Sequence, residues 1–150
     1  MSKTIKVRAI EARDKEAWLP LWHGYLTFYK TTLPSSQDEL TWERLMDPNY
    51  EIRGLVVELD GVVQGITHYS FQTSTWSPVG YCYLEDLFVN PEFRGAGLGR
   101  ALIDAVRDIA IEKKLSRLYW NTDSSNETAR KLYDSYTSES GKVQYRIPLN

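Results

Sequence analysis

The chain has 150 residues and a mass of 17.4 kDa, which is enough for one domain and too little for two ordinary ones. Its apolar fraction of 42% and charged fraction of 25% are ordinary for a soluble globular protein, which excludes collagen-like, coiled-coil and disordered chains. The formal net charge of −2 argues against the uniformly basic surface of a nucleic-acid binder.

The cysteine content and the hydropathy exclude further classes. Cys82 is the one cysteine, so neither an internal disulfide nor a cysteine-rich zinc site can form, and we expect no metal. No stretch approaches the ~18 apolar residues of a membrane span. Residues 1–8 lack the apolar segment of a signal peptide. We therefore expect a cytoplasmic protein that binds neither nucleic acid nor membranes.

The first half of the chain predicts one strand, two helices and a hairpin. Apolar residues recur at helical spacing after the first strand, which predicts the first helix. A capping-box pattern predicts the start of the second helix. Two β-branched runs joined by Asp-Gly are the signal of a tight hairpin. In chain order we expect a strand over 6–10, a helix from Asp14, a helix after Ser36–Glu39 that Pro48 ends, and strands over 52–59 and 62–71.

The second half alternates strands and helices. An aromatic and β-branched run predicts a long strand, and a one-sided apolar stripe predicts the helix after it. Antiparallel strands first and strand–helix–strand units later indicate an α/β fold with a mixed sheet and helices on both faces. We expect a loop over 72–80, strands over 81–89, 117–121 and 143–149, and helices over 98–114 and 127–136.

A glycine-rich turn over Val89–Arg100 joins a strand to a helix. Glycines allow a tight turn whose N–H groups, at the positive end of the helix dipole, can bind phosphate oxygens. A Walker A loop needs Lys-Ser/Thr after its last glycine, and a dinucleotide fingerprint needs G-x-G-x-x-G, so neither matches Gly95–Arg100. A glycine-rich connection without a ligand stays open on this segment alone.

Two motifs together resemble one enzyme family. Arg94–Gly99, preceded by Leu87–Val89, resembles the acyl-CoA pyrophosphate loop of the GNAT superfamily of N-acetyltransferases, R/Q-x-x-G-x-G/A. Asn126–Tyr133 is similar to the N-x-x-A-x-x-x-Y segment of that family. Within the superfamily, Tyr83–Val89 and the segment 131–146 are most similar to the diamine (spermidine/spermine) and the histone/polyamine acetyltransferase branches.

The resemblance implies a fold and a cofactor. It implies the GNAT acyl-CoA N-acyltransferase fold in a single domain over residues 1–150, a mostly antiparallel sheet in which two central strands splay apart. The pantetheine arm of acetyl-CoA would lie in that gap, held by backbone groups. The residues implied in binding acetyl-CoA are Leu87, Phe88, Val89, Arg94, Gly95, Ala96, Gly97, Leu98, Gly99, Arg100, Asn126 and Ala129.

The resemblance also implies a pair of proton-transfer residues. An amine with a pKa of ~10.4 must lose a proton before it attacks, and a thiolate whose thiol has a pKa of ~8.5 leaves better once protonated. Glu85 is the implied base and Tyr133 the implied acid. Strand alternation puts Glu85 on one face with Tyr83 and Leu87. The alternatives are a solvated carboxylate at Glu85 and a packing aromatic at Tyr133. Cys82 would face away, as a buried apolar residue rather than a nucleophile.

The acceptor site is expected to be aromatic and acidic. Tyr25, Tyr29 and Trp76 would contact an ammonium group by cation–π attraction, and Asp86 would add negative charge. We expect direct acetyl transfer to a small amine, a polyamine or a lysine-like side chain, by a homodimer whose last strand pairs across the subunit boundary. The alternatives are an acetyltransferase for protein N-termini or histone tails and a non-catalytic acyl-CoA sensor.

Overall fold

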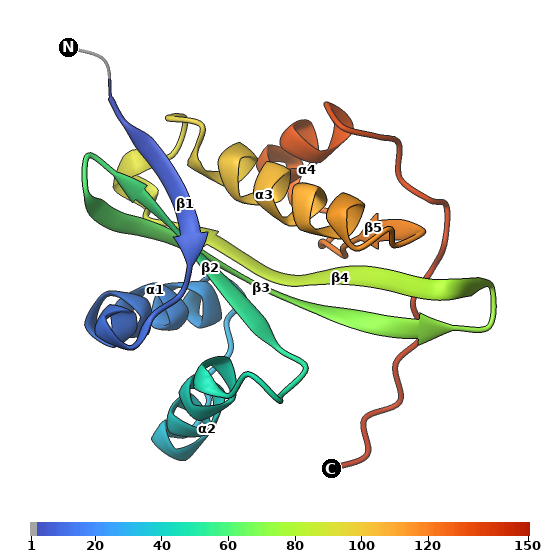
Figure 1. Ribbon diagram of the computed structural model, residues 1–150, viewed down its shortest axis with the longest axis horizontal. Coiled ribbons are helices and arrows are strands. Elements are labelled where there is room, and N and C mark those ends of the chain that lie inside the picture. The colour runs from blue at the N-terminus through green and yellow to red at the C-terminus, as the bar shows by residue number, and fades with distance from the viewer. Residues whose placement is uncertain (1–2) are drawn as a thin grey trace. The chain divides into compact units, whose positions relative to one another are not determined.

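The chain forms two compact units. Figure 1 shows the computed structural model, which describes residues 3–150. The first unit extends through Trp120, and the second comprises Asn121–Asn150. Among the described residues, every strand lies in the first unit.

The first unit is built on a mixed five-stranded sheet. β1, β2 and β3 each pair antiparallel with the next strand, and β5 runs parallel to β4. The predicted mixed, mostly antiparallel sheet is therefore confirmed. The strands, which follow each other in space as in sequence, are β1 (Ile5–Ala9), β2 (Arg53–Leu59), β3 (Val62–Ser74), β4 (Ser77–Val89) and β5 (Arg117–Tyr119).

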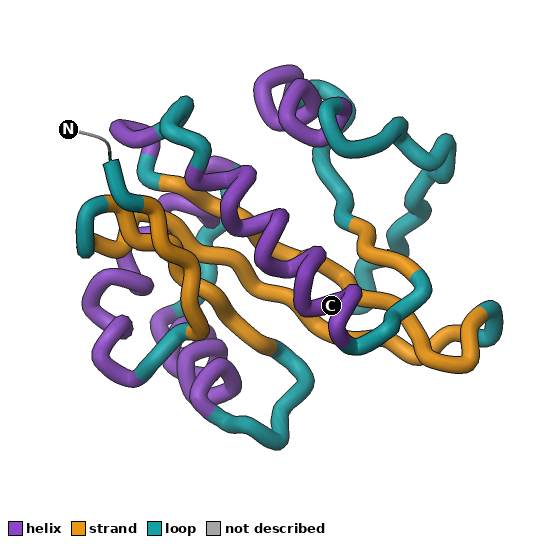
Figure 2. The backbone as a smooth tube through the Cα atoms, turned by 45° about the horizontal axis from the view of Figure 1, so that its top comes forward, coloured by secondary structure: helices purple, strands orange, loops and turns teal. Residues whose placement is uncertain are grey.

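Helices cover both faces of this sheet. The helices α1 (Lys15–Phe28) and α2 (Ser35–Met46) lie on one face, and α3 (Leu98–Glu112) lies on the other (Figure 1, Figure 2). We call these sides the α1 face and the α3 face. Two short 3-10 turns, Ala12–Asp14 and Pro91–Phe93, precede α1 and the glycine-rich turn.

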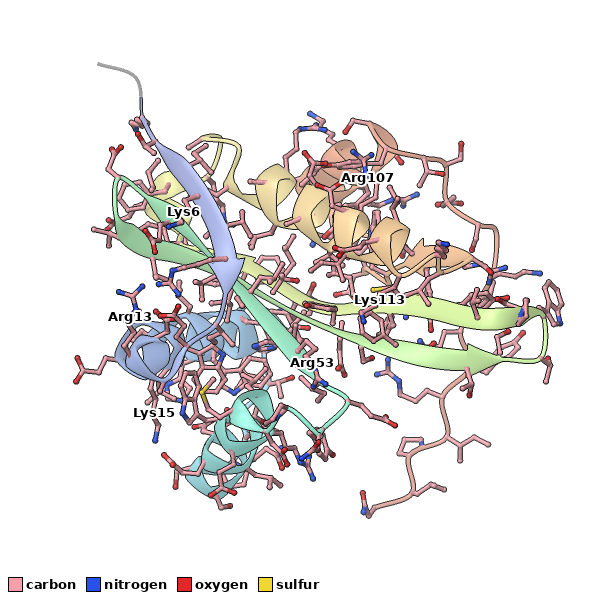
Figure 3. The ribbon with its side chains drawn as sticks, viewed as in Figure 1. Lys6, Arg13, Lys15, Arg53, Arg107 and Lys113 are labelled. Atoms are coloured by element: carbon pink, nitrogen blue, oxygen red, sulfur yellow. The ribbon has the colours of Figure 1, made fainter. Side chains whose placement is uncertain are left out.

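The α1 face is packed with aromatic side chains. The indole of Trp18 is completely buried, 5.9 Å from that of Trp22 and 5.2 Å from that of Trp42, measured between ring centroids. Lys15 and Glu39 join the two helices at the surface with an ion pair of 3.0 Å (Figure 3). Helical spacing predicts an apolar stripe over Trp18–Phe28, and the structure buries it except at its end, where Phe28 is 48% exposed. The core on this face comprises Trp18, Leu21, Trp22, Leu26, Trp42, Leu45, Val56, Ile66 and Phe88.

Helix α3 covers its face of the sheet with aliphatic side chains. The predicted helical stripe of α3 is confirmed, and each buried large side chain contributes about 1.5–3 kcal/mol by leaving water. At the C-terminal end of α3, Lys113 extends over the β3–β4 hairpin, with Nζ 5.0 Å from the ring centroid of Phe71 (Figure 3). The buried residues of α3 are Leu98, Leu102, Ile103, Val106 and Ala110.

Two local predictions were wrong in the first unit. α2 begins at Ser35 after Pro34, so Ser36–Glu39 lies inside the first turn and forms no capping box. Residues 72–80 are mostly strand rather than loop, because the ladder between β3 and β4 continues to the pair Ser74 and Ser77. The polar Ser and Thr residues of this segment therefore belong to a paired hairpin.

The second unit contains α4 (Glu127–Asp134) followed by an irregular tail. Helix α4 agrees with the helix predicted from Glu127. The predicted strand over Val143–Leu149 is wrong for this structure, since those residues form no strand. Alternating apolar residues make a strand only where an edge pairs with them, and here Val143, Tyr145, Ile147 and Leu149 are 76–92% exposed.

No helix among residues 3–150 is both long and apolar enough to cross a membrane.

Candidate active site

A β-bulge interrupts the pairing of β3 with β4. His68 pairs with Asp86, whereas Tyr69 pairs with Leu84, so Glu85 is an extra residue without a partner on β3. A bulge breaks the strict alternation of a strand and re-aims a side chain. Sequence alternation could not show this shift.

The bulge brings two carboxylates to the same side. The electrostatic neighbours of Glu85 are Asp86, His68 and Tyr25, all of which belong to the α1 face. Leu87 pairs with Thr67, one position from the Phe88 that packs under α1, so Leu87 lies on the opposite side. The predicted common face of Glu85 and Leu87 is therefore wrong, because the bulge adds a residue between them.

The surroundings of Glu85 suit proton transfer. Its side chain keeps access to solvent, but packing at the sheet surface removes part of its hydration. This desolvation, with the adjacent charge of Asp86, raises the pKa of the Glu85 carboxyl, and His68 opposes the shift. A carboxylate with a raised pKa is a stronger base than an ordinary one.

β4 loses its parallel neighbour next to the bulge. β4 and β5 pair only from Tyr81 with Arg117 to Tyr83 with Tyr119, and β4 then continues to Val89. Within the described residues, no strand pairs with β4 on that side beyond Tyr83. Backbone N–H and C=O groups of an unpaired edge can bind an extended ligand. This is the strand separation that the family resemblance implied.

Asp86 is held by His68 of β3 and faces Tyr25 of α1. His68 Nδ1 lies 2.9 Å from Asp86 Oδ2, and Tyr25 is an electrostatic neighbour of the same carboxylate. Burial, and next the negative charge of Asp86, raise the pKa of Tyr25, so its hydroxyl stays protonated and acts as a donor. Asp86 is thus a fixed anion beside Glu85.

Two further residues predicted for the acceptor site, Tyr25 and Tyr29, adjoin Asp86. The ring of Tyr25 stacks on Trp22, with centroids 5.4 Å apart, and contacts Tyr29 at 4.9 Å. Trp22 covers one face of Tyr25 and Tyr29 packs beside it, so Tyr25 does not present an open ring to a ligand. Tyr29 continues the aromatic surface toward the end of α1.

Trp76 does not join this group within one chain. It is 79% exposed at the tip of the β3–β4 hairpin. The tip lies at the far end of the sheet from α1 (Figure 1, Figure 2). Glu85 lies nine positions along the chain from Trp76, roughly 25–30 Å at ~3.3 Å per residue of strand. The predicted place of Trp76 near the acceptor wall is therefore wrong for a single chain.

The glycine-rich turn has the geometry of an anion cradle. Gly95 and Gly97 have φ of 85° and 88°, and an added Cβ at either would meet no atom within 4 Å. Gly97 caps α3, so the amides of Leu98 and Gly99 have no intrahelical acceptor. The backbone is therefore open to a ligand at the positive end of α3.

The remaining predicted cofactor residues of the first unit contribute in different ways. The Arg94 guanidinium lies over the rings of Phe28 and Phe88, 5.8 and 5.6 Å from their centroids, which fixes the turn against α1 and β4. Ala96 N–H donates to the Phe93 carbonyl at 3.4 Å. The side chains of Phe88 and Leu98 are buried, so only their backbone can face a ligand.

The second motif is helical within the second unit. The Asn126 side chain accepts from the Ala129 N–H at 3.3 Å, so Asn126 caps α4 as one interpretation expected. Tyr133 is half-buried on the last turn of α4. The spacing of Asn126, Ala129 and Tyr133 is thus that of a capped helix.

Cys82 is completely buried, and burial raises the pKa of its thiol to about 11. The interpretation of Cys82 as an inert apolar residue is confirmed. Within residues 3–150 no three His, Cys, Asp or Glu side chains gather as metal ligands.

Sequence reasoning missed His68 and the polar role of Trp18. No motif contains either residue, and the helical spacing of Trp18 predicts only a core position. The one available signal was the pair of consecutive acids, Glu85 and Asp86, in an otherwise apolar strand.

Comparisons with known proteins agree with this geometry. Residues 16–136 match the Acetyltransferase (GNAT) family. A D-amino-acid N-acetyltransferase of Saccharomyces cerevisiae is 35% identical over 144 residues, which cover 95% of this chain and 89% of the relative. A thialysine N-epsilon-acetyltransferase of Bos taurus is 39% identical over 71 residues, covering 47% of this chain and 41% of the relative.

Solved structures share the fold. An aminoglycoside N-acetyltransferase in complex with CoA superposes with a TM-score of 0.84 at 19% identity, covering 100% of this chain and 98% of the other. A ribosomal-protein-alanine N-acetyltransferase from Brucella melitensis biovar Abortus 2308 gives 0.81 at 23% identity, covering 97% and 99%. With the family match over most of its length, the chain belongs to the GNAT family of N-acetyltransferases.

Proposed function

We propose that this N-acetyltransferase transfers the acetyl group of acetyl-CoA, by direct attack, to the primary amine of a small amine, a polyamine or a lysine-like side chain. The observation that carries the proposal is the bulge, which puts Glu85 beside the fixed anion Asp86 where β4 has left β5. A cationic amine is attracted there and can lose its proton there.

The residues present fit acetyl-CoA. Gly95 and Gly97 leave open space where a side chain would stand, and the amides of Leu98 and Gly99 point from the start of α3. These groups would hold the diphosphate, and the backbone of Leu87–Val89 would hold the pantetheine arm. Arg94 and Arg100 add positive charge to the turn. When bound, acetyl-CoA supplies an activated thioester.

Glu85 acts as the general base. A primary amine has a pKa of ~10.4 and is protonated at neutral pH. Glu85 accepts a proton from the ammonium nitrogen, directly or through a water. Its raised pKa lies closer to the pKa of the amine, which favours this proton transfer. A backbone N–H near Leu87 or Phe88 polarises the carbonyl under attack.

Tyr133 acts as the general acid, its Oη donating the proton that the departing sulfur needs. The support is its place in the N-x-x-A-x-x-x-Y motif on the capped helix α4. Tyr133→Phe should lower kcat by about tenfold or more and leave the KM for acetyl-CoA nearly unchanged. Unchanged turnover would show that Tyr133 only packs.

A substrate panel tests the proposed acceptor. Spermidine, thialysine, a D-amino acid and a lysine-containing peptide are each offered with acetyl-CoA, and free thiol is measured. We expect the highest kcat/KM with spermidine or thialysine, because two carboxylates repel a carboxylate next to the reacting nitrogen. The D-amino acid is the second candidate, favoured by the 35% identical relative.

Each other outcome of the panel has a meaning. Preference for the peptide would favour a protein acetyltransferase. Binding of CoA in calorimetry with no thiol release from any amine would favour a non-catalytic sensor and overturn the proposal.

We also propose a homodimer in the cytoplasm. The exposed apolar alternation of Val143–Leu149 supports pairing with a second chain. Light scattering during gel filtration tests this. A monomer at micromolar concentration would contradict the dimer.

A further inference from the structure

A chain of hydrogen bonds on the α1 face ends at the candidate active site. The indole Nε1 of Trp18 lies 3.0 Å from His68 Nε2, and His68 Nδ1 lies 2.9 Å from Asp86 Oδ2. Trp18 is 0% exposed and His68 2%, so the bond between them is shielded from water, and the bond to Asp86 lies where the buried chain meets the partly exposed carboxylate. The chain therefore runs from the centre of the core to the carboxylate beside Glu85.

The direction of this chain is fixed by chemistry. An indole N–H can only donate, so His68 Nε2 must accept and carries no proton. The imidazole proton then lies on Nδ1, where it donates to Asp86. Trp18 thus selects the one tautomer of His68 that can bind the carboxylate.

The other groups facing Asp86 leave part of its carboxylate available. Tyr25 from α1 is an electrostatic neighbour of Asp86, Tyr29 packs beside Tyr25, and Glu85 of β4 is the adjacent charge. Asp38 from α2 is bonded to Trp22 and His23 instead, at 3.0 and 2.8 Å. An ionised carboxylate has about four acceptor sites, so the bond from His68 leaves room for an ammonium group.

We propose that Trp18 and His68 are positioning residues, which act through Asp86 by fixing its carboxylate in the orientation that binds the ammonium group of the acceptor. The inference rests on the proposed function, because it takes Asp86 to be the acceptor's anion. Neither Trp18 nor His68 touches the reacting atoms.

A double-mutant cycle tests this role. His68→Leu should raise the KM for the amine about tenfold, the order expected for a charge-assisted hydrogen bond, and leave the KM for acetyl-CoA unchanged. In an Asp86→Asn background the same change should add less than about twofold, because His68 acts only through Asp86. Equal effects in both backgrounds, or none in either, would overturn the proposal.

Two further variants provide controls. His68→Asn keeps an N–H donor near the position of Nδ1 and should restore most of the affinity for the amine, and it carries the test if His68→Leu does not fold. His23→Leu removes the other histidine, which binds Asp38 and is 52% exposed at its side chain. It should leave the KM for the amine unchanged, and a matching rise would show a general effect of histidine loss.

A second readout does not depend on activity. The chain has two histidines, so nitrogen-15 labelling of histidine gives two imidazoles to assign by NMR. His68 should show a proton on Nδ1 and none on Nε2, and Trp18→Phe should free Nε2 to take a proton while Asp86 still holds the proton on Nδ1. A proton on Nε2 in the wild type would overturn the proposal. If the wild type acetylated no amine, the proposed function would fail, and this spectrum would still judge the hydrogen-bond chain.

Discussion

The two faces of the sheet bury side chains of different kinds. On the α3 face, helix α3 buries aliphatic residues such as Leu102 and Val106, whose role is packing alone. The α1 face buries Trp18 and Trp22 together with polar atoms of His68 and Asp38, each with a hydrogen-bond partner. Apolar burial is enough to stabilise a fold, whereas buried polar groups are costly unless paired. Paired polar groups therefore show where orientation matters.

The largest expected effect is at Glu85 on the α1 face. Glu85→Gln should lower kcat/KM by roughly 10²–10⁴-fold, the usual contribution of a general base. In the wild type, kcat/KM should fall as the pH drops through the raised pKa of Glu85, because protonation removes the base. The variant should lack this step in its pH–rate profile, and a retained step would assign the base to another group.

Glu85→Gln should lose activity but should not lose stability. A carboxyl whose pKa is raised by folding weakens the fold where it is ionised, and its stabilising contribution is present only at lower pH. Glu85→Gln should therefore have an equal or higher Tm at neutral pH. A clearly lower Tm would mean that Glu85 has a structural role.

A second polar cluster near the α1 face should affect stability alone. Arg8 bonds Asp14 through two nitrogens at 2.7 and 2.9 Å and Glu58 at 2.6 Å, which lowers the pKa of the buried Asp14. Asp14→Asn should cost about 3 kcal/mol in the free energy of unfolding, measured with urea, and leave kcat unchanged in the folded fraction.

The pH dependence follows from the lowered pKa of Asp14. Its stabilising contribution is present above the ordinary aspartate pKa of 3.8 and is lost as the pH falls through the lower pKa of the folded state. Wild type and variant should therefore converge in stability under acid. A constant difference down to the lowest pH would contradict the ion pair.

The α3 face should behave as packing only. Val106 is completely buried two turns beyond the glycine-rich turn, and Val106→Ala should cost about 2 kcal/mol through lost burial and a small cavity. The KM for the amine should be unchanged once the protein is folded. A raised KM would show that the two faces are coupled.

The glycine-rich turn offers a matched pair of variants. Gly97 and Gly61 both have positive φ, 88° and 84°, and open space around a new Cβ. Alanine at either should cost about 1–2 kcal/mol. Only Gly97→Ala should raise the KM for acetyl-CoA, because Gly61 lies in the β2–β3 turn. Equal effects on that KM would contradict the cradle.

The smallest effect is expected at Trp76. Since Trp76 is exposed at the hairpin tip, Trp76→Ser should change the stability by less than about 0.5 kcal/mol. It should leave the KM for the amine unchanged if one chain forms the acceptor site. A higher KM would indicate that the tip of one chain reaches the site of another.

Local patterns predicted the parts of the fold that depend on local spacing. The stripe of α3, the hairpin at Asp60-Gly61 and the glycines of the turn follow from periodicity and backbone freedom, which neighbouring residues determine. The candidate active site was predicted from the sequence only in part. Glu85 and Asp86 were selected, but the bulge that aligns them depends on the register with β3, and the bond from His68 joins residues 18 positions apart. Such non-local pairings leave no periodic signal.

The strand predicted at the C-terminus failed for a related reason. The alternation of Val143–Leu149 is a true strand pattern, but a strand also needs an edge to pair with, and no sequence pattern names that edge. The loop predicted over residues 72–80 was wrong for the opposite reason. These residues have weak strand propensity, but pairing between β3 and β4 makes most of them strand.

A crystal structure with CoA and an acceptor amine would test the central claim most directly. The diphosphate should lie on the amides at Gly95–Gly99, the pantetheine along the unpaired edge of β4, and the amine between the carboxylates of Glu85 and Asp86. A diphosphate bound away from the turn, or an amine on the side of the sheet away from α1, would contradict it.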